Sequence, residues 1–227
     1  MPVDKDTPVA KPMSVVVLWH MHQPDYRHLR TGAVCLPWTY LHAIKDYVDM
    51  AAHLEAVPEA RAVINFVPIL LEQIEDYVEQ IRGYLKGQGA IRDPVLAALA
   101  EPALPGNEAE RLRLMRDCLR ANRQNMIERF EPYTRLANMA QWYETHPDSL
   151  MYASNQFLAD LLVWYHLSWM AESAQRTDAR IHRLQEKAGG FSLHDRRDVL
   201  QIVLEQLESV IPRYRRLADA GQIELCM

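Results

Sequence analysis

The chain contains no apolar run that approaches the roughly 18 residues needed to span a membrane. Residues 1–11 are polar and interrupted by prolines, so they lack the apolar segment of a secretory signal peptide. Cysteine is scarce, because only Cys35, Cys118 and Cys226 are present, without metal-ligand spacing. Scattered cysteines in odd number are typical of reduced thiols, so we expect a cytoplasmic protein.

Positive charge is not in excess either. The 227 residues hold 25 lysines and arginines against 30 aspartates and glutamates, a formal net charge of -5. This balance gives no reason to expect nucleic acid or a membrane surface as a partner. Phosphate-binding glycine loops, nucleophile elbows and CxxC motifs are also missing. What the chain does have is 49% hydrophobic residues, enough for one substantial core.

The most informative stretch is the apolar run from Val15 to Pro24. Its β-branched residues predict a buried strand. Side chains alternate between the two faces of a strand, so His20 and His22 should project to the same side. Pro24 cannot donate to a sheet ladder, so the strand should end near it. The sequence therefore predicts two imidazoles at the carboxyl end of the first strand, where α/β folds bind ligands.

The next part of the chain alternates between helix and strand patterns. A helix is predicted over about 38–56, a second buried strand over 61–67, and a helix from Pro68 to about Leu85. This alternation indicates parallel strands joined by crossover helices. Only helical patterns follow, and we interpret residues from about 93 to 190 as a helical insertion beside the sheet. Trp164, Tyr165 and Trp169 in this region are expected to be core residues, and His166 structural.

The pattern of helix and strand returns once more near residue 227. Ser192 and Asp195 predict a capping box at the start of a long helix, and Gly221 predicts a left-handed turn at its end. Arginine pairs on this helix, 196–197 and 215–216, are interpreted as solvated faces. A third strand is expected over 222–227, with residues 1–13 a flexible tail. Three parallel strands cannot close a barrel, so we expect the chain to be the N-terminal portion of a longer protein.

Three polar features of these strands and loops suit a binding or catalytic site. His20 and His22 suit metal chelation or a hydrogen bond to a substrate hydroxyl, or else one is buried and one exposed. Glu224 suits a general acid or base, an acceptor for sugar hydroxyls, or an exposed strand end. Trp38, at the junction of a loop and a helix, suits stacking on a sugar or packing in the core.

Several segments together resemble glycoside hydrolase family 57, which includes α-amylases, amylopullulanases, 4-α-glucanotransferases and branching enzymes. Residues 19–26 (WHMHQPDY) and 36–47 (LPWTYLHAIKDY) resemble its N-terminus, and 221–225 (GQIEL) its second signature motif. Residues 65–68 (NFVP) and 158–164 (LADLLVW) are also similar to family segments. The resemblance covers about residues 13–227.

The resemblance implies a fold, a reaction and a set of binding residues. The fold would be an α/β one, the N-terminal part of an incomplete (β/α)7 barrel formed by residues 14–227, with parallel strands and a large helical insertion. The reaction would act on α-glucans with retention, which takes two carboxyls roughly 5 to 5.5 Å apart. The family's two catalytic carboxyls, a glutamate and an aspartate in later motifs, are expected beyond Met227, so this chain alone should be inactive. The residues expected to bind an α-glucan or maltooligosaccharide, without a metal or cofactor, are His20, His22, Gln23, Trp38 and Glu224.

Two other classes of protein remain open at this point. A metal-dependent barrel hydrolase or deacetylase would use His20 and His22 as ligands and contain stoichiometric zinc or iron. The lack of a third ligand at a strand end counts against it. A non-catalytic helical module would bind no maltooligosaccharide. Whether the reaction is hydrolysis, transfer or branching, and the oligomeric state, are not predicted.

Overall fold

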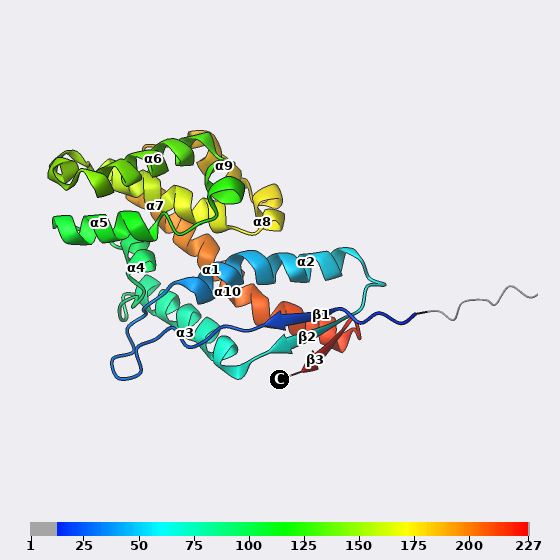
Figure 1. Ribbon diagram of the computed structural model, residues 1–227. Coiled ribbons are helices and arrows are strands. Elements are labelled where there is room, and N and C mark those ends of the chain that lie inside the picture. Colours follow the sequence, from blue (N-terminus) through cyan, green and yellow to red (C-terminus); the bar gives the residue numbers. More distant parts are fainter. Residues whose placement is uncertain (1–12, 227) are drawn as a thin grey trace, which may run out of the picture.

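The computed structural model describes residues 13–226 (Figure 1), so the predicted tail over 1–13 lies outside the described residues except for Met13. The elements follow in the order β1 (Leu18–Met21), α1 (Trp38–His42), the π-helix η1 (Ala43–Tyr47), α2 (Val48–Ala56), β2 (Ala62–Phe66), α3 (Pro68–Leu85), α4 (Pro94–Ala100), α5 (Glu108–Asp117), the π-helix η2 (Arg123–Ile127), α6 (Glu131–Thr145), the 3-10 helix η3 (Pro147–Tyr152), α7 (Asn155–Trp169), α8 (Glu172–Thr177), α9 (Ala179–Lys187), α10 (Leu193–Asp219) and β3 (Ile223–Cys226). Within 13–226, no helix combines the length and the apolar character of a membrane span.

The three strands form one parallel sheet in the order β1-β2-β3, as the alternation of strands and helices predicted. His20 lies opposite Asn65, which lies opposite Cys226. Two residues earlier on each strand, Val63 lies between Leu18 and Glu224. Because residues opposite each other point to the same side of a sheet, the named side chains of both rows share one face.

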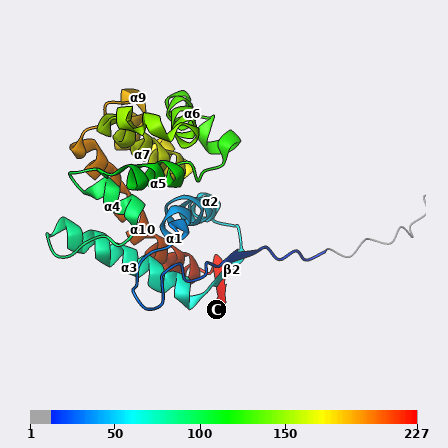
Figure 2. The same cartoon turned by 60° about the vertical axis from the view of Figure 1, so that its left-hand side comes forward.

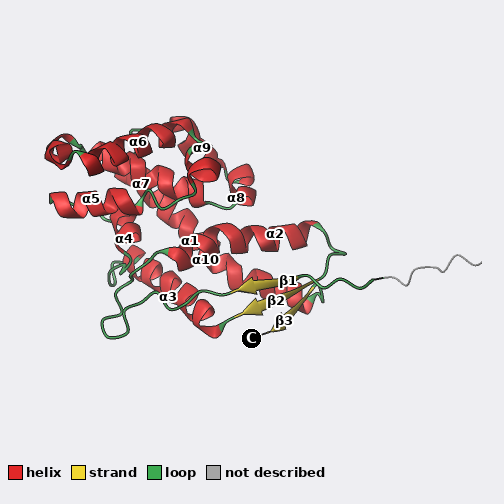
Figure 3. Cartoon of the chain, in the orientation of Figure 1, coloured by secondary structure: helices red, strands yellow, loops and turns green. Residues whose placement is uncertain are grey.

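Helices cover the other face of this sheet. Met21, Ile64 and Phe66 are buried there, and Phe66 meets Tyr214 of α10 edge to face, with ring centroids 4.9 Å apart. Figure 3 shows the strands lying beside the helices at one end of the molecule. The face with His20 and Glu224 has no such cover among the described residues, so we call it the open face.

The first strand is therefore not buried as predicted. The side chains from Val15 to Leu18 are 48% to 77% exposed, and only Leu18 of these four belongs to β1. A β-branched run does not reveal how many faces of its sheet are covered. β1 is an edge strand with one open face, so Leu18, which points to that face, remains in contact with solvent while Met21 on the other face is buried.

The predicted helices are present. The first runs from α1 through η1 to α2, with a π-helical turn at Ala43–Tyr47. Ser192 and Asp195 form the capping box of α10, and Gly221 has a φ of 69°. Arg196, however, is 4% exposed rather than solvated, because its guanidinium donates to backbone carbonyls of Ala98, Glu101 and Pro102.

The helical region, α4 to α9, is built around α7, and its extent as an inserted unit remains a prediction. Every residue of α7 from Phe157 to Trp169 is buried except Asp160, which confirms the expected core roles of the aromatic residues there. Helix α10 runs from this region down to the sheet (Figures 1 and 2), contacting α7 and α9 as well as α2 and α3. One long helix thus ties the helical region to the sheet.

Candidate functional site

The two histidines of the first strand lie together on the open face. Their ring centroids are 5.5 Å apart and their planes differ by 15°, so the rings stack. This confirms that both project to one side. Both side chains are exposed, and neither imidazole makes a hydrogen bond to a residue within 13–226. Their nitrogens are therefore free to meet a ligand.

Glu224 lies on the same face but not beside the histidines. It stands on β3, two strands away from β1, and aligns with Leu18 rather than with His20. With neighbouring strands about 4.8 Å apart, β1 and β3 are separated by about 10 Å. Glu224 is exposed. The open face therefore holds an imidazole pair on one edge and a carboxylate on the other, with a gap between them.

Asn65 stands in this gap, on the central strand. Its amide nitrogen donates to the backbone carbonyl of Cys226 at 3.2 Å. Its Oδ1 is buried and has no hydrogen-bond partner among residues 13–226. A buried acceptor without a donor is costly, and less than 1 Å² of this oxygen is accessible, so it does not face a ligand on the open face. Asn65 was not predicted as a site residue. A polar residue within the second apolar strand, opposite His20, could have indicated it.

Gln23 follows the histidines but is engaged within the protein. Its Oε1 accepts from the Tyr26 hydroxyl at 2.7 Å, and its Nε2 donates to the Tyr47 hydroxyl at 3.4 Å. Both ends of the amide thus have protein partners. Its role in binding substrate stays a prediction. The contacts show that Gln23 connects the loop after β1 to the π-helix η1.

A second glutamine, Gln73 of α3, fixes this loop in place. Its Oε1 accepts from the Tyr26 backbone N–H at 3.2 Å and from the Thr39 hydroxyl at 3.1 Å. Its Nε2 donates to the carbonyls of Pro24 at 3.0 Å and Ile69 at 3.2 Å. Gln73 is 3% exposed. Its role in holding this loop was not predicted from the sequence, although a glutamine on the buried face of a helix could have indicated it.

Trp38 does not lie on the open face. It lines a separate cavity of about 500 Å³ beside the helical region, without contact to His20, His22 or Glu224 in its lining. The loop that joins β1 to α1 carries it away from the strands. The structure therefore divides the predicted site residues between two places.

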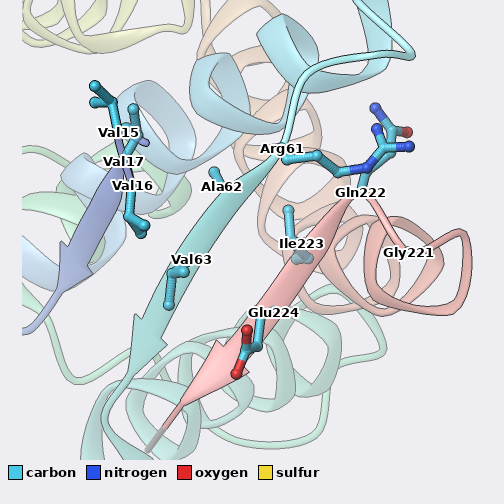
Figure 4. A pocket seen from close by; sticks show the side chains of 10 residues that line it. All are labelled: Val15, Val16, Val17, Arg61, Ala62, Val63, Gly221, Gln222, Ile223 and Glu224. Carbon is cyan, nitrogen blue, oxygen red and sulfur yellow. The ribbon is translucent and has the colours of Figure 1, made fainter. Parts of the chain in front are cut away.

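A further hollow of about 310 Å³ lies at the amino ends of the strands (Figure 4). Glu224 borders it, and the other lining residues are Val15, Val16, Val17, Arg61, Ala62, Val63, Gly221, Gln222 and Ile223. Its lining does not include either histidine, so Glu224 and His22 share a face of the sheet without sharing one enclosed cavity.

The metal-dependent alternative gains no support from the described part of the chain. Within residues 13–226, no three histidine, cysteine, aspartate or glutamate side chains gather where they could hold one ion. His20 and His22 would thus need a further ligand from elsewhere to form a typical zinc site.

In barrels of parallel strands, the residues that bind and convert the substrate lie at the carboxyl ends of the strands, where His20 and His22 stand. A comparison with protein-family models matches residues 16–227 to Glycosyl hydrolase family 57. The chain therefore belongs to this family, as its motifs predicted. Comparisons with curated proteins and with solved structures gave no match.

Proposed function

We propose that the open face binds a sugar residue of an α-glucan, as the substrate-binding part of a retaining glycoside hydrolase or transglycosidase. The observation that carries this proposal is the placement of His20, His22, Asn65 and Glu224 on one uncovered face of a parallel sheet. The imidazole nitrogens donate or accept, while the carboxylate of Glu224 accepts. This mixture suits the hydroxyl groups of a neutral sugar, each of which both donates and accepts.

The same face supplies binding groups but not a full catalytic pair. Retention requires two carboxyls roughly 5 to 5.5 Å apart. Among the described strand residues of the open face, Glu224 is the one carboxylate. We therefore assign His20, His22 and Glu224 to holding the sugar, and bond exchange to carboxyls contributed by other segments. In a (β/α)7 barrel, the open face would be the inner face, covered by further strands.

The test is the affinity for maltose of a Glu224→Gln variant. Glutamine keeps the shape of the side chain but removes the charge that strengthens a hydrogen bond from a sugar hydroxyl, so affinity should fall about tenfold. Isothermal titration calorimetry measures it. Glu131→Gln on α6 is a matched control, because Glu131 is exposed and its one ion pair among residues 13–226 is with Arg135 on its own helix. Equal affinity of wild type and Glu224→Gln would refute the assignment of Glu224.

A second measurement addresses turnover. Purified protein of this length should release no reducing sugar from soluble starch, because the open face presents a single carboxylate within 13–226. Clear release by protein of verified mass would show that another carboxyl of this chain completes the catalytic pair.

A further inference from the structure

The exposed apolar side chains of the helical region gather in one short stretch of the chain. Between α3 and β3, the exposed large hydrophobic residues are Met139 and Trp142 of α6 and Met151 and Tyr152 of η3. Their exposed fractions are 47%, 48%, 72% and 76%. A single exposed apolar residue needs no explanation, but a cluster of large ones marks an interaction surface.

Helix α6 carries aromatic residues on two opposite sides. Its buried side packs on the helical region and consists of Tyr133, Ala137, Ala140 and Tyr143. Its outer side carries Met139, Trp142 and, at its carboxyl end, His146, separated by three and four residues, so they form one line along the helix. The Trp142 indole stacks on the His146 imidazole, with ring centroids 4.5 Å apart and planes 14° apart. Because Trp142 is still half exposed, this stacked pair presents indole surface to solvent.

The 3-10 helix η3 extends this outer surface. It follows α6 directly and contacts both α5 and α6, with Leu150 as its buried residue. Met151 and Tyr152, which come next, are exposed. The residues that we call the α6–η3 patch are therefore Met139, Trp142, His146, Met151 and Tyr152. Figures 1 and 2 show α6 on the side of the molecule that lies away from the strands.

The charges around the patch suit a second copy of the chain. Arg135 pairs with Glu131 at 2.9 Å, and Glu144 pairs with an arginine of α5 at 2.8 Å, so these charges are already neutralised. Asp148 and His146 are exposed and have no ion pair to a residue within 13–226. A two-fold axis can bring the acid of one copy to the imidazole of the other. A strongly charged partner would find no excess of the opposite charge here.

The area of the patch is close to what a weak dimer requires. Large side chains offer roughly 200 Å² each, so four that are half to three-quarters exposed present roughly 500 Å² per copy. Two copies face to face would bury about 1,000 Å² in total, the lower limit of a specific interface. A dissociation constant of the order of tens of micromolar is expected for such a contact.

We infer that the α6–η3 patch docks a second copy of this chain across a two-fold axis. Tryptophan, tyrosine and methionine at the centre, with paired charges around them, form the composition that is typical of protein–protein interfaces. The patch lies away from the strands, so the open face stays free in this dimer (Figure 1). The inference therefore does not depend on what the open face binds.

Sedimentation equilibrium between about 5 and about 500 µM, which brackets the expected dissociation constant, tests the inference. Trp142→Glu and Tyr152→Glu each place a carboxylate in both halves of the interface, so each should weaken the dimer about a hundredfold. Trp142→Tyr keeps an aromatic ring and should change the dissociation constant by less than about fivefold. Leu18→Glu is the matched control, because Leu18 is 55% exposed but lies on the open face.

Loss of the dimer in both glutamate variants at α6 and η3, with an unchanged Leu18→Glu dimer and with folding verified by circular dichroism, supports the inference. A wild-type protein that stays monomeric at the highest concentration overturns it. So does a dimer that only Leu18→Glu weakens, which would assign self-association to the sheet. A monomer that loses affinity for maltoheptaose in Trp142→Glu would also overturn it and assign the patch to a sugar.

Discussion

Acidification from pH 6.5 to pH 4 is expected to lower the free energy of unfolding by about 3 kcal/mol through His166 alone. His166 is fully buried in α7. Its Nδ1 donates to the carbonyl of Leu162 at 2.8 Å, and its Nε2 accepts from the Tyr40 hydroxyl at 3.1 Å, which requires a neutral ring. Burial lowers the pKa of this imidazole from 6.5 to about 4.

The direction of the effect follows from the two pKa values. Below pH 6.5 the unfolded chain binds a proton at this histidine, whereas the folded protein does not until about pH 4. The contribution of His166 to the free energy of unfolding is therefore complete above pH 6.5 and falls by about 1.4 kcal/mol per pH unit as the pH decreases across that interval. Urea denaturation at several pH values between these limits measures the slope.

A His166→Gln variant should lose this part of the pH dependence, because glutamine can donate to Leu162 and accept from Tyr40 but does not titrate. The ring resonances of His166 provide a test that needs no substitution, since NMR titration reports its pKa directly. Titration of His166 near 6.5 in the folded protein would contradict the prediction.

Replacing Gln73 by leucine should lower the free energy of unfolding by about 3 kcal/mol. It should also weaken maltose binding. Leucine fills a similar volume but leaves the Tyr26 N–H, the Thr39 hydroxyl and the Pro24 carbonyl without their partner. Unpaired polar groups in a buried setting cost about 1 to 3 kcal/mol each, and partial access to water reduces the sum. Denaturant unfolding and calorimetry with maltose measure the two effects.

Gln141→Leu on the exposed side of α6 is the matched control for this substitution. A loss well below 1 kcal/mol in Gln73→Leu would show that the loop keeps its conformation without this amide. A stability loss with unchanged maltose affinity would show that Gln73 supports the fold but not the position of His22.

The order of strands and helices was predictable because its signals are local. The capping box at Ser192 and the left-handed turn at Gly221 depend only on neighbouring residues. Burial was not predictable in the same way. Val15 is exposed because no described helix covers its side of the chain, and Arg196 is buried because the end of α4, almost a hundred residues earlier, lies against it. Both depend on tertiary contacts.

The candidate site shows the same difference between features set by neighbouring residues and features set by tertiary contacts. Strand alternation placed His20 and His22 together correctly, since it acts over two residues. Asn65 and Gln73 were missed because their importance comes from register and from contacts across the chain. Trp38 belongs to the family motif, but the loop between β1 and α1 sets its position, and no short pattern reports where such a loop leads.

The length of helix α10 affects how the position of Glu224 depends on the helical region. It is 27 residues long, contacts α7 and α9 near its start and α2 and α3 further along, and the strand that carries Glu224 follows directly after Gly221. At a rise of about 1.5 Å per residue, it is a lever of about 40 Å, so a tilt of one degree displaces its far end by about 0.7 Å. A tilt of this helix about its contacts with the helical region would therefore shift the strand that carries Glu224, and its ion pairs Arg213–Glu55 and Arg82–Glu208 oppose such a tilt.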